Sequence, residues 1–221
     1  MFAGYFEQAD TVTLAKRLLG KQLFYQSPAG LLSGYIVETE AYLGQSDQAA
    51  HAFGGHRSAK NEALYHEAGT IYIYTIYGQF LLNLITQAVG VPQGILIRGL
   101  EPHYGLKQMQ ANRRRTLKSA FELTNGPGKL MKALGIQSLD LNLASFETSP
   151  LTLSLTAVKR PQAIVAAPRI GINKNKGNWE SAPLRFYVAH NPYVSKMPRR
   201  QMDLTNYGWQ ASLRNSDQVQ S

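Results

Sequence analysis

The chain has 221 residues, of which 44% are hydrophobic and 17% charged, and it contains no cysteine. This length and composition suit one soluble domain with its own core, and the lack of cysteine excludes disulfides, thiolate metal sites and a cysteine nucleophile. Lys and Arg number 23 against 14 Asp and Glu, a formal charge of +9, which favours a polyanionic partner such as nucleic acid.

The sequence contains neither an apolar run approaching the ~18 residues of a membrane span nor the features of a signal peptide. We therefore expect a cytoplasmic protein without a membrane partner, associated with the nucleoid if it is bacterial. No linker divides the chain, so we expect a single domain over residues 1–200. Residues 201–221 would form a C-terminal tail that is loosely ordered at its end.

The N-terminal half is expected to contain one helix followed by strands. Asp10 can cap a helix over residues 11–19, which Gly20 can end. Residues 21–26 and 31–42 flank a turn and predict a β-hairpin. Further β-prone runs, most of them bounded by turn-forming or polar residues, lie at 70–77, 80–86, 94–100, 151–155, 163–167 and 184–189.

Two more helices are expected between these strands. One would begin at Glu101-Pro102 and run toward Arg113–Arg115, and another would open at Gly126–Lys129 and end at Gly135. Strands outnumber helices and several are linked by hairpins. The sequence therefore predicts an α+β domain, with a curved, mostly antiparallel sheet, flanking helices and a protruding β-hairpin.

Two carboxylates occupy one face of the strand at 31–42. At period two, Glu38, Glu40 and Tyr42 point to the same side, with roughly 7 Å between the Cα atoms of the two glutamates. One glutamate could serve as a general base for water and the other as a supporting carboxylate. The alternative is a pair of edge-strand glutamates that face solvent or arginines.

Aromatic residues around this strand could form a slot for a flat base. Tyr42, His51, Tyr72 and Tyr74 have faces on which a nucleobase can stack, although ordinary sheet packing is the alternative. His51, His56, Glu62 and His66 are residue types that can bind zinc, but their spacing is not that of a helical zinc motif. We expect no metal, and we expect His51 to be neutral.

Other residues have features that suit contact with DNA. Gly126 to Lys129 resembles a phosphate-binding turn at a helix start, with an ordinary turn as the alternative. Arg169 is one of many basic residues that could contact phosphates. Tyr77 stands beside Gly78 at an expected hairpin tip, where it is either packed or a wedge that enters the base stack.

Six blocks in this chain together resemble the alkyladenine (3-methyladenine) DNA glycosylase family. They occur in the family's order and, with the residues between them, span about residues 10–195. The blocks are Val37–Gly44, Ala49–His51, Gly69–Gly78, Leu96–Pro102, Asn125–Leu130 and Pro183–Val188.

The resemblance implies excision of alkylated purines from double-stranded DNA by hydrolysis of the N-glycosidic bond, without a cofactor. Glu40 matches the general base and Arg98 the arginine beside the catalytic water, while Tyr77 matches the intercalating residue. The residues matched to the base pocket, two of them through backbone groups, are Tyr42, Ala49, His51, Tyr74, Asn83 and Ile170.

Asn83 matches the asparagine that excludes the exocyclic amino group of guanine. Its spacing from Tyr77 is one residue shorter than the family pattern, and its spacing to Arg98 is longer. Two rival functions remain: a nucleic-acid-binding domain without catalysis, and a hydrolase of free nucleosides that uses Glu38 and Glu40 as a pair. One lesion in a duplex requires only a monomer, so a monomer is expected.

Overall fold

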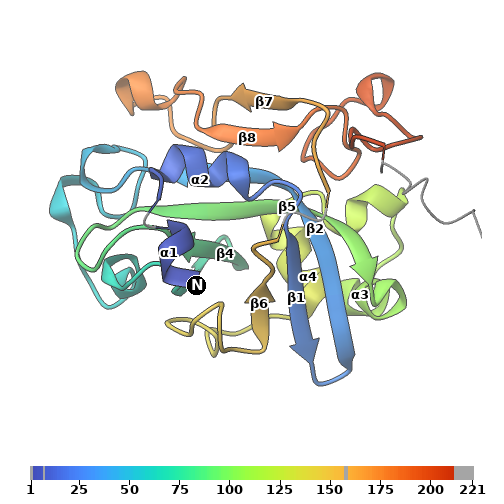
Figure 1. The fold of residues 1–221 in the computed structure, drawn as a ribbon, viewed down its shortest axis with the longest axis horizontal. Coiled ribbons are helices and arrows are strands. Elements are labelled where there is room, and N and C mark those ends of the chain that lie inside the picture. Colours follow the sequence, from blue (N-terminus) through green and yellow to red (C-terminus); the bar gives the residue numbers. More distant parts are fainter. Residues whose placement is uncertain (1, 7, 157–158, 212–221) are drawn as a thin grey trace, which may run out of the picture.

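The computed structural model of the protein describes residues 2–6, 8–156 and 159–211. Within these ranges eight strands form one antiparallel sheet, and four α-helices pack around it (Figure 1). The strands are β1 Gln22–Ser27, β2 Gly30–Tyr42, β3 Ile71–Ile76, β4 Gln79–Ile85, β5 Gly94–Tyr104, β6 Leu151–Leu153, β7 Ile164–Ala167 and β8 Arg185–Val188. The helices are α1 Phe2–Phe6, α2 Thr11–Arg17, α3 Leu106–Arg113 and α4 Pro127–Leu134. The predicted α+β class and antiparallel sheet are confirmed.

The long strand β2 organises the sheet. Along one edge it pairs with β5, and along the other its first half pairs with β1 and its second half with β8. The register with β5 shifts between Ile36 and Thr39, an irregularity of the kind that bends a strand locally. Strands from distant parts of the sequence therefore meet around Glu38 and Glu40.

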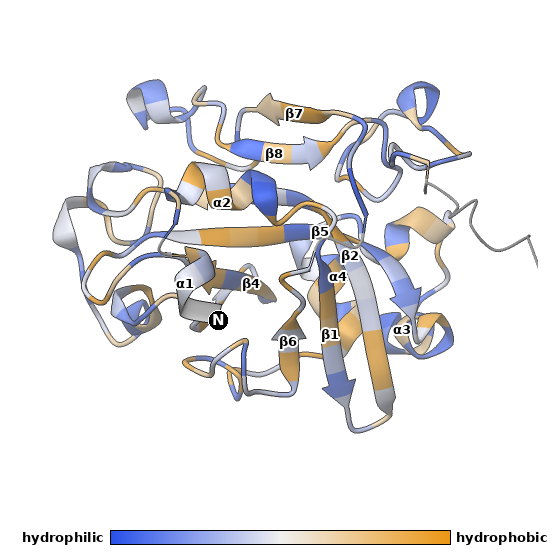
Figure 2. Ribbon diagram, viewed as in Figure 1, coloured by the Kyte–Doolittle hydropathy of each residue, from blue (hydrophilic) through white to orange (hydrophobic). Residues whose placement is uncertain are grey.

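The two faces of β2 have different neighbours. Val37 and Ala41 are fully buried, and Thr39 between them donates a hydrogen bond from Oγ1 to the carbonyl of Ala15 in α2 at 2.9 Å. The opposite face carries Glu38 and Glu40. The first part of β5 beside it is apolar, as Figure 2 shows, and Ile95, Leu96 and Ile97 are buried. The chain thus places two carboxylates inside the domain rather than on its surface.

The hairpin of β1 and β2 and the helix after Asp10 are confirmed. Asp10 accepts the backbone N–H of Thr13 at 2.8 Å, which satisfies one of the free donors at the start of α2. Further along the chain, α4 begins at Pro127 and ends at Leu134, and Gly135, with a φ of 78°, caps its C-terminus. Short 3-10 turns complete the elements: Gly44–Ser46, Phe53–Gly55, Glu62–Tyr65, Ala120–Leu123, Gly177–Trp179 and Arg199–Gln201.

The helix expected to run toward Arg113–Arg115 is present as α3, but its expected start at Glu101-Pro102 is wrong, because β5 continues through both residues to Tyr104 and α3 begins only at Leu106. Glu101 is buried and accepts hydrogen bonds from Asn191 at 2.8 Å and from the indole of Trp209 at 2.6 Å. These long-range contacts favour the extended conformation over the helix that the local sequence allows.

Trp209 lies in the segment expected to be a tail, yet its side chain is buried against the domain. The chain from residue 201 to residue 211 is therefore fixed at least at this point. The expectation of loose order concerned the last ten residues, and these lie outside the described part of the chain.

Candidate active site

Glu40 is fully buried near the end of β2, and its two oxygens have different partners. Oε1 accepts the backbone N–H of Ile170 at 2.7 Å and lies 3.2 Å from Nη1 of Arg98. Oε2 accepts the hydroxyl of Tyr42 at 2.9 Å. Burial raises the pKa of Glu40, whereas Arg98 and these hydrogen bonds lower it in part. The carboxylate is thus held in one orientation with a raised pKa, as a general base requires.

A cleft of about 450 Å³ lies beside this carboxylate. Tyr42, Arg98 and Ile170, the three partners of Glu40, all line the cleft. The space is in the range of small-molecule sites. The remaining lining residues are Ala49, His51, Tyr74, Ile76, Tyr77, Gln79, Leu81, Leu96, Gly126, Pro127, Gly128, Lys129, Gly171 and Ile172.

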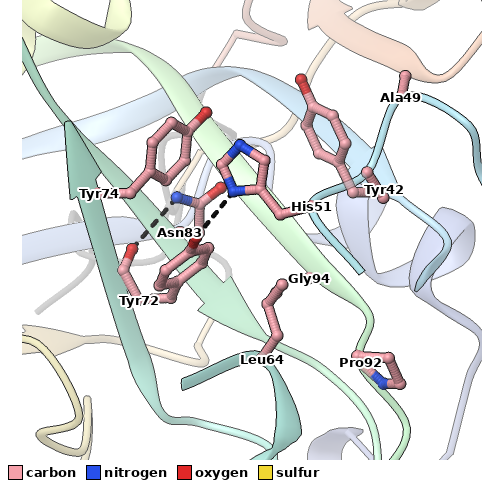
Figure 3. A pocket seen from close by; sticks show the side chains of 10 residues that line it. Tyr42, Ala49, His51, Leu64, Tyr72, Tyr74, Asn83, Pro92 and Gly94 are labelled. Carbon is pink, nitrogen blue, oxygen red and sulfur yellow. Dashed lines mark hydrogen bonds between the residues drawn. The ribbon is translucent and has the colours of Figure 1, made fainter. Parts of the chain in front are cut away.

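Aromatic side chains form one wall of the cleft. Figure 3 shows Tyr42 across from His51 and Tyr74, with Ala49 close to Tyr42. The rings of His51 and Tyr74 meet edge to face with 4.5 Å between centroids. Nδ1 of His51 lies 2.8 Å from the hydroxyl of Tyr72. The expected slot residues are therefore brought together in space.

Burial lowers the pKa of His51, so the imidazole is neutral at neutral pH. Burial also raises the pKa of Tyr74 to about 12, which keeps its hydroxyl protonated. The wall consequently carries neutral, electron-rich rings beside the buried carboxylate. Such a surface suits a flat group that carries positive charge.

Asn83 reaches the same region from β4. Its side chain is buried, and Nδ2 donates to the carbonyl of Tyr72 at 3.1 Å (Figure 3). Asn83 lines a small hollow of about 30 Å³ behind the aromatic wall, together with Tyr42, Ala49 and His51. Despite the shifted spacing noted in the sequence, Asn83 lies in this hollow next to the aromatic residues, although it does not line the cleft itself.

Tyr77 stands at the tip of the hairpin formed by β3 and β4. It is 94% exposed, and it also lines the cleft. Both tip residues have positive φ, 48° for Tyr77 and 68° for Gly78, as a two-residue type I′ turn requires. Of the two alternatives, the packed tip is wrong and the ring projects freely.

The start of α4 borders the cleft beside this hairpin. Gly126 and Lys129 both line it, and Lys129 Nζ donates to Oδ1 of Asn125 at 2.7 Å. A Cβ atom on Gly128 would lie 1.7 Å from Oε1 of Gln79, so the glycine leaves room for the Gln79 side chain in its present position against α4. The expected phosphate-binding turn thus sits next to the exposed Tyr77.

Arg169 is not available for the expected phosphate contact. Its side chain is fully buried, and both Nη atoms donate to Asp47, at 2.6 and 2.9 Å. Asp47 in turn accepts the backbone N–H groups of Leu43 and Ala49. The pair fixes the loop that carries Ala49 and His51. No role at the site was expected of Asp47, although aspartate in such a turn is a common signal.

Glu38, the other carboxylate on this face of β2, does not line the cleft. It is fully buried and faces arginines, as one alternative anticipated, and not solvent. The candidate zinc ligands also have other partners, since Glu62 pairs with Arg57 and His51 with Tyr72. In the described part of the chain, no three His, Cys, Asp or Glu side chains are grouped to hold a metal ion.

The site thus combines a buried carboxylate, an aromatic wall and a border that carries Lys129 and the exposed Tyr77. Comparisons with known proteins identify the family of the chain. The family model described as methylpurine-DNA glycosylase matches residues 5–192, and the chain belongs to this family. The protein is therefore a DNA glycosylase that acts in DNA repair. This confirms the family resemblance seen in the sequence motifs.

Three bacterial relatives provisionally named 3-methyladenine DNA glycosylase match over most of their length. The protein from Lactiplantibacillus plantarum is 48% identical over 93% of this chain and 96% of its own. Those from Enterococcus faecalis and Staphylococcus saprophyticus are 46% and 45% identical, each over 92% of this chain and over 87% and 98% of their own. Among the helices that the structure describes, none has the length and apolar character needed to cross a membrane.

Proposed function

We propose that the protein flips alkylated purines such as 3-methyladenine out of duplex DNA and hydrolyses their N-glycosidic bond. Glu40 accepts a proton from a water molecule, whose oxygen bonds to C1′ of the sugar. The bond between C1′ and the purine nitrogen breaks, and the purine leaves with its electron pair. The products are the free base and an abasic site, and no cofactor takes part.

The observation that carries this proposal is the buried carboxylate of Glu40 directly below the cleft. Its three partners line the cleft, so a water molecule or sugar entering from that side meets a fixed acceptor. Arg98 is placed to hold the carboxylate and to lie beside the attacking water. One oriented carboxylate suffices for a cationic lesion, because the charged purine is already a good leaving group.

The aromatic wall accounts for selection of damaged bases. Stacking against Tyr42, His51 and Tyr74 would favour a cationic purine over its neutral parent through cation–π attraction. We propose that Ala49 and Ile170 contact the base or water through backbone groups, and that Asn83 excludes the amino group of guanine. Tyr77 fills the gap in the duplex, with Gly126 and Lys129 on the phosphates. A single site of this kind needs only a monomer. The substrate of the enzyme would be the DNA of the cell.

The mechanism proceeds by hydrolysis alone, since Lys129 at the cleft is engaged with Asn125 and serves as a phosphate contact. Borohydride treatment during reaction should therefore trap no covalent adduct with DNA. The direct test is release of labelled base from methylated duplex DNA, compared across a panel of modified bases. Duplex binding without release would favour the non-catalytic alternative, and release from free nucleosides alone would favour the nucleoside hydrolase.

A further inference from the structure

Arg98 bridges two buried carboxylates. Its Nη1 lies 3.2 Å from Oε1 of Glu40, and its Nε donates to Oε1 of Glu38 at 3.4 Å. The arginine side chain is 7% exposed and both glutamate side chains are fully buried. Because one guanidinium faces both anions, a change at Glu38 alters how Arg98 is presented to Glu40.

Glu38 is itself held by residues from the C-terminal part of the chain. Oε1 accepts Oγ–H of Ser195 at 2.8 Å and Nη1 of Arg185 at 3.0 Å, and Oε2 accepts the backbone N–H of Ser195 at 2.9 Å. Ser195 thus supplies two of the donors that fix this carboxylate. It lies three residues beyond the end of the region matched by the family model, residue 192.

A glycine beside Arg98 allows this segment to approach. A Cβ atom on Gly99 would lie 2.8 Å from the carbonyl oxygen of Tyr193, closer than real contacts permit. Asn191 secures the segment further, since its Oδ1 accepts the backbone N–H of Tyr193 and its Nδ2 donates to Glu101. The turn at 191–195 is therefore seated directly on the strand that carries Arg98.

We propose that Ser195 is a positioning residue for hydrolysis, which acts through Glu38 to hold Arg98 against Glu40. This proposal rests on the proposed function of Glu40. With the Ser195 hydroxyl in place, Glu38 accepts hydrogen bonds from several donors, and Arg98 contacts it only through Nε. Without that hydroxyl, Glu38 is short of one donor and attracts Arg98 away from Glu40.

This mechanism predicts opposite pH effects for two substitutions. Arg98 lowers the pKa of Glu40 and Glu38 raises it. Ser195→Ala weakens the influence of Arg98, so the pKa of Glu40 rises and the acidic limb of the rate profile moves to higher pH. Glu38→Gln removes the neighbouring negative charge and frees Arg98 for Glu40, so the limb moves to lower pH.

The test uses the full chain and single-turnover excision of a permanently cationic N-methylated purine from duplex DNA. Ser195→Ala should lower the rate about tenfold, less than the ~100-fold that a misplacement of about 1 Å can cause, and leave lesion binding unchanged. Ser195→Thr keeps the hydroxyl and should restore the rate. Ser33→Ala is the matched control. Like Ser195, Ser33 is a buried serine, but it lies elsewhere, on β2, where its Oγ accepts a hydrogen bond of 3.0 Å from Nε2 of Gln22.

A second measurement does not depend on activity. The Nε–H resonance of Arg98, assigned by its loss in Arg98→Lys, should shift or broaden in Ser195→Ala and stay unchanged in Ser33→Ala. If Ser195→Ala matches Ser33→Ala in rate, pH profile and resonance, the proposal is overturned. If the wild-type protein releases no base, the proposed function fails, and the resonance alone decides whether Ser195 positions Arg98.

Discussion

The hydroxyl of Tyr42 donates to Oε2 of Glu40 across 2.9 Å, although the two residues are only two positions apart on one strand. Their side chains share a face of β2, so the contact follows from the alternation of the strand. It fixes one carboxylate oxygen, while Ile170 and Arg98 fix the other. The proposed general base and the aromatic wall are thereby joined in one hydrogen-bonded unit.

Substitution of Glu40 by Gln is expected to reduce single-turnover base release by about 10²- to 10⁴-fold, the usual contribution of general base catalysis. Gln keeps the shape of the side chain but cannot accept the proton from water. Affinity for a lesion-containing duplex, measured by fluorescence anisotropy, should remain close to that of the wild type. Undiminished release would show that Glu40 is not the base.

As the pH is lowered, the excision rate should begin to fall at a pH above the range in which ordinary carboxyl groups titrate. Burial raises the pKa of Glu40 from 4.5, so the protonated, inactive form persists to higher pH than for an exposed glutamate. As pH rises through this raised pKa, the base form and the rate increase together. A permanently cationic lesion should be used, since its departure needs no protonation; a midpoint at or below 4.5 would contradict the prediction.

Tyr77→Ala should weaken binding to a lesion-containing duplex by about tenfold or more and affect undamaged duplex much less. Stacking of an aromatic ring on a base is worth roughly 1–3 kcal/mol, and it is available only where the stack opens. Tyr104→Ala provides the control, because Tyr104 is also exposed, at 57%, and does not line the cleft. Equal losses for both duplexes would remove the wedge role.

Lys129→Ala should reduce the salt dependence of DNA affinity, with the slope of log affinity against log salt falling by about 1 unit. The cause is the loss of one phosphate contact and its released counterion. Lys107→Ala, on the exposed side of α3 and outside the cleft lining, should leave the slope unchanged. An equal change of slope in both variants would show that Lys129 contributes no more to phosphate binding than an exposed lysine outside the cleft.

Arg169→Ala should act on stability rather than on DNA contacts. Removal of one partner from a buried ion pair costs about 3–5 kcal/mol, and it would leave Asp47 buried without its cation. Urea denaturation should show this loss in the free energy of unfolding. The salt slope of DNA binding should not change, and a fall of about 1 unit would restore the phosphate contact first expected from the sequence.

The local elements and the face of Glu40 were readable from the sequence because they depend on short-range patterns. Alternation placed Glu40 and Tyr42 together on one strand, and Tyr77-Gly78 marked the hairpin tip. Contacts between distant segments were not readable. Nothing near Ser195 signals that it meets Glu38, and nothing near Arg169 signals its burial with Asp47. Glu101 lies within β5 instead of starting a helix for the same reason, since its partners lie up to 108 residues away.

The left-handed backbone of Tyr77 has a consequence for how lesions are found. A non-glycine residue in this conformation is strained, and the type I′ turn and the close packing of Gln79 on Gly128 maintain it before any DNA arrives. The backbone that carries the ring is therefore ordered before binding, and the cost of ordering it was met during folding. For the proposed wedge role, this means that the duplex deforms while the hairpin keeps its shape, which favours sites where damaged DNA opens most readily.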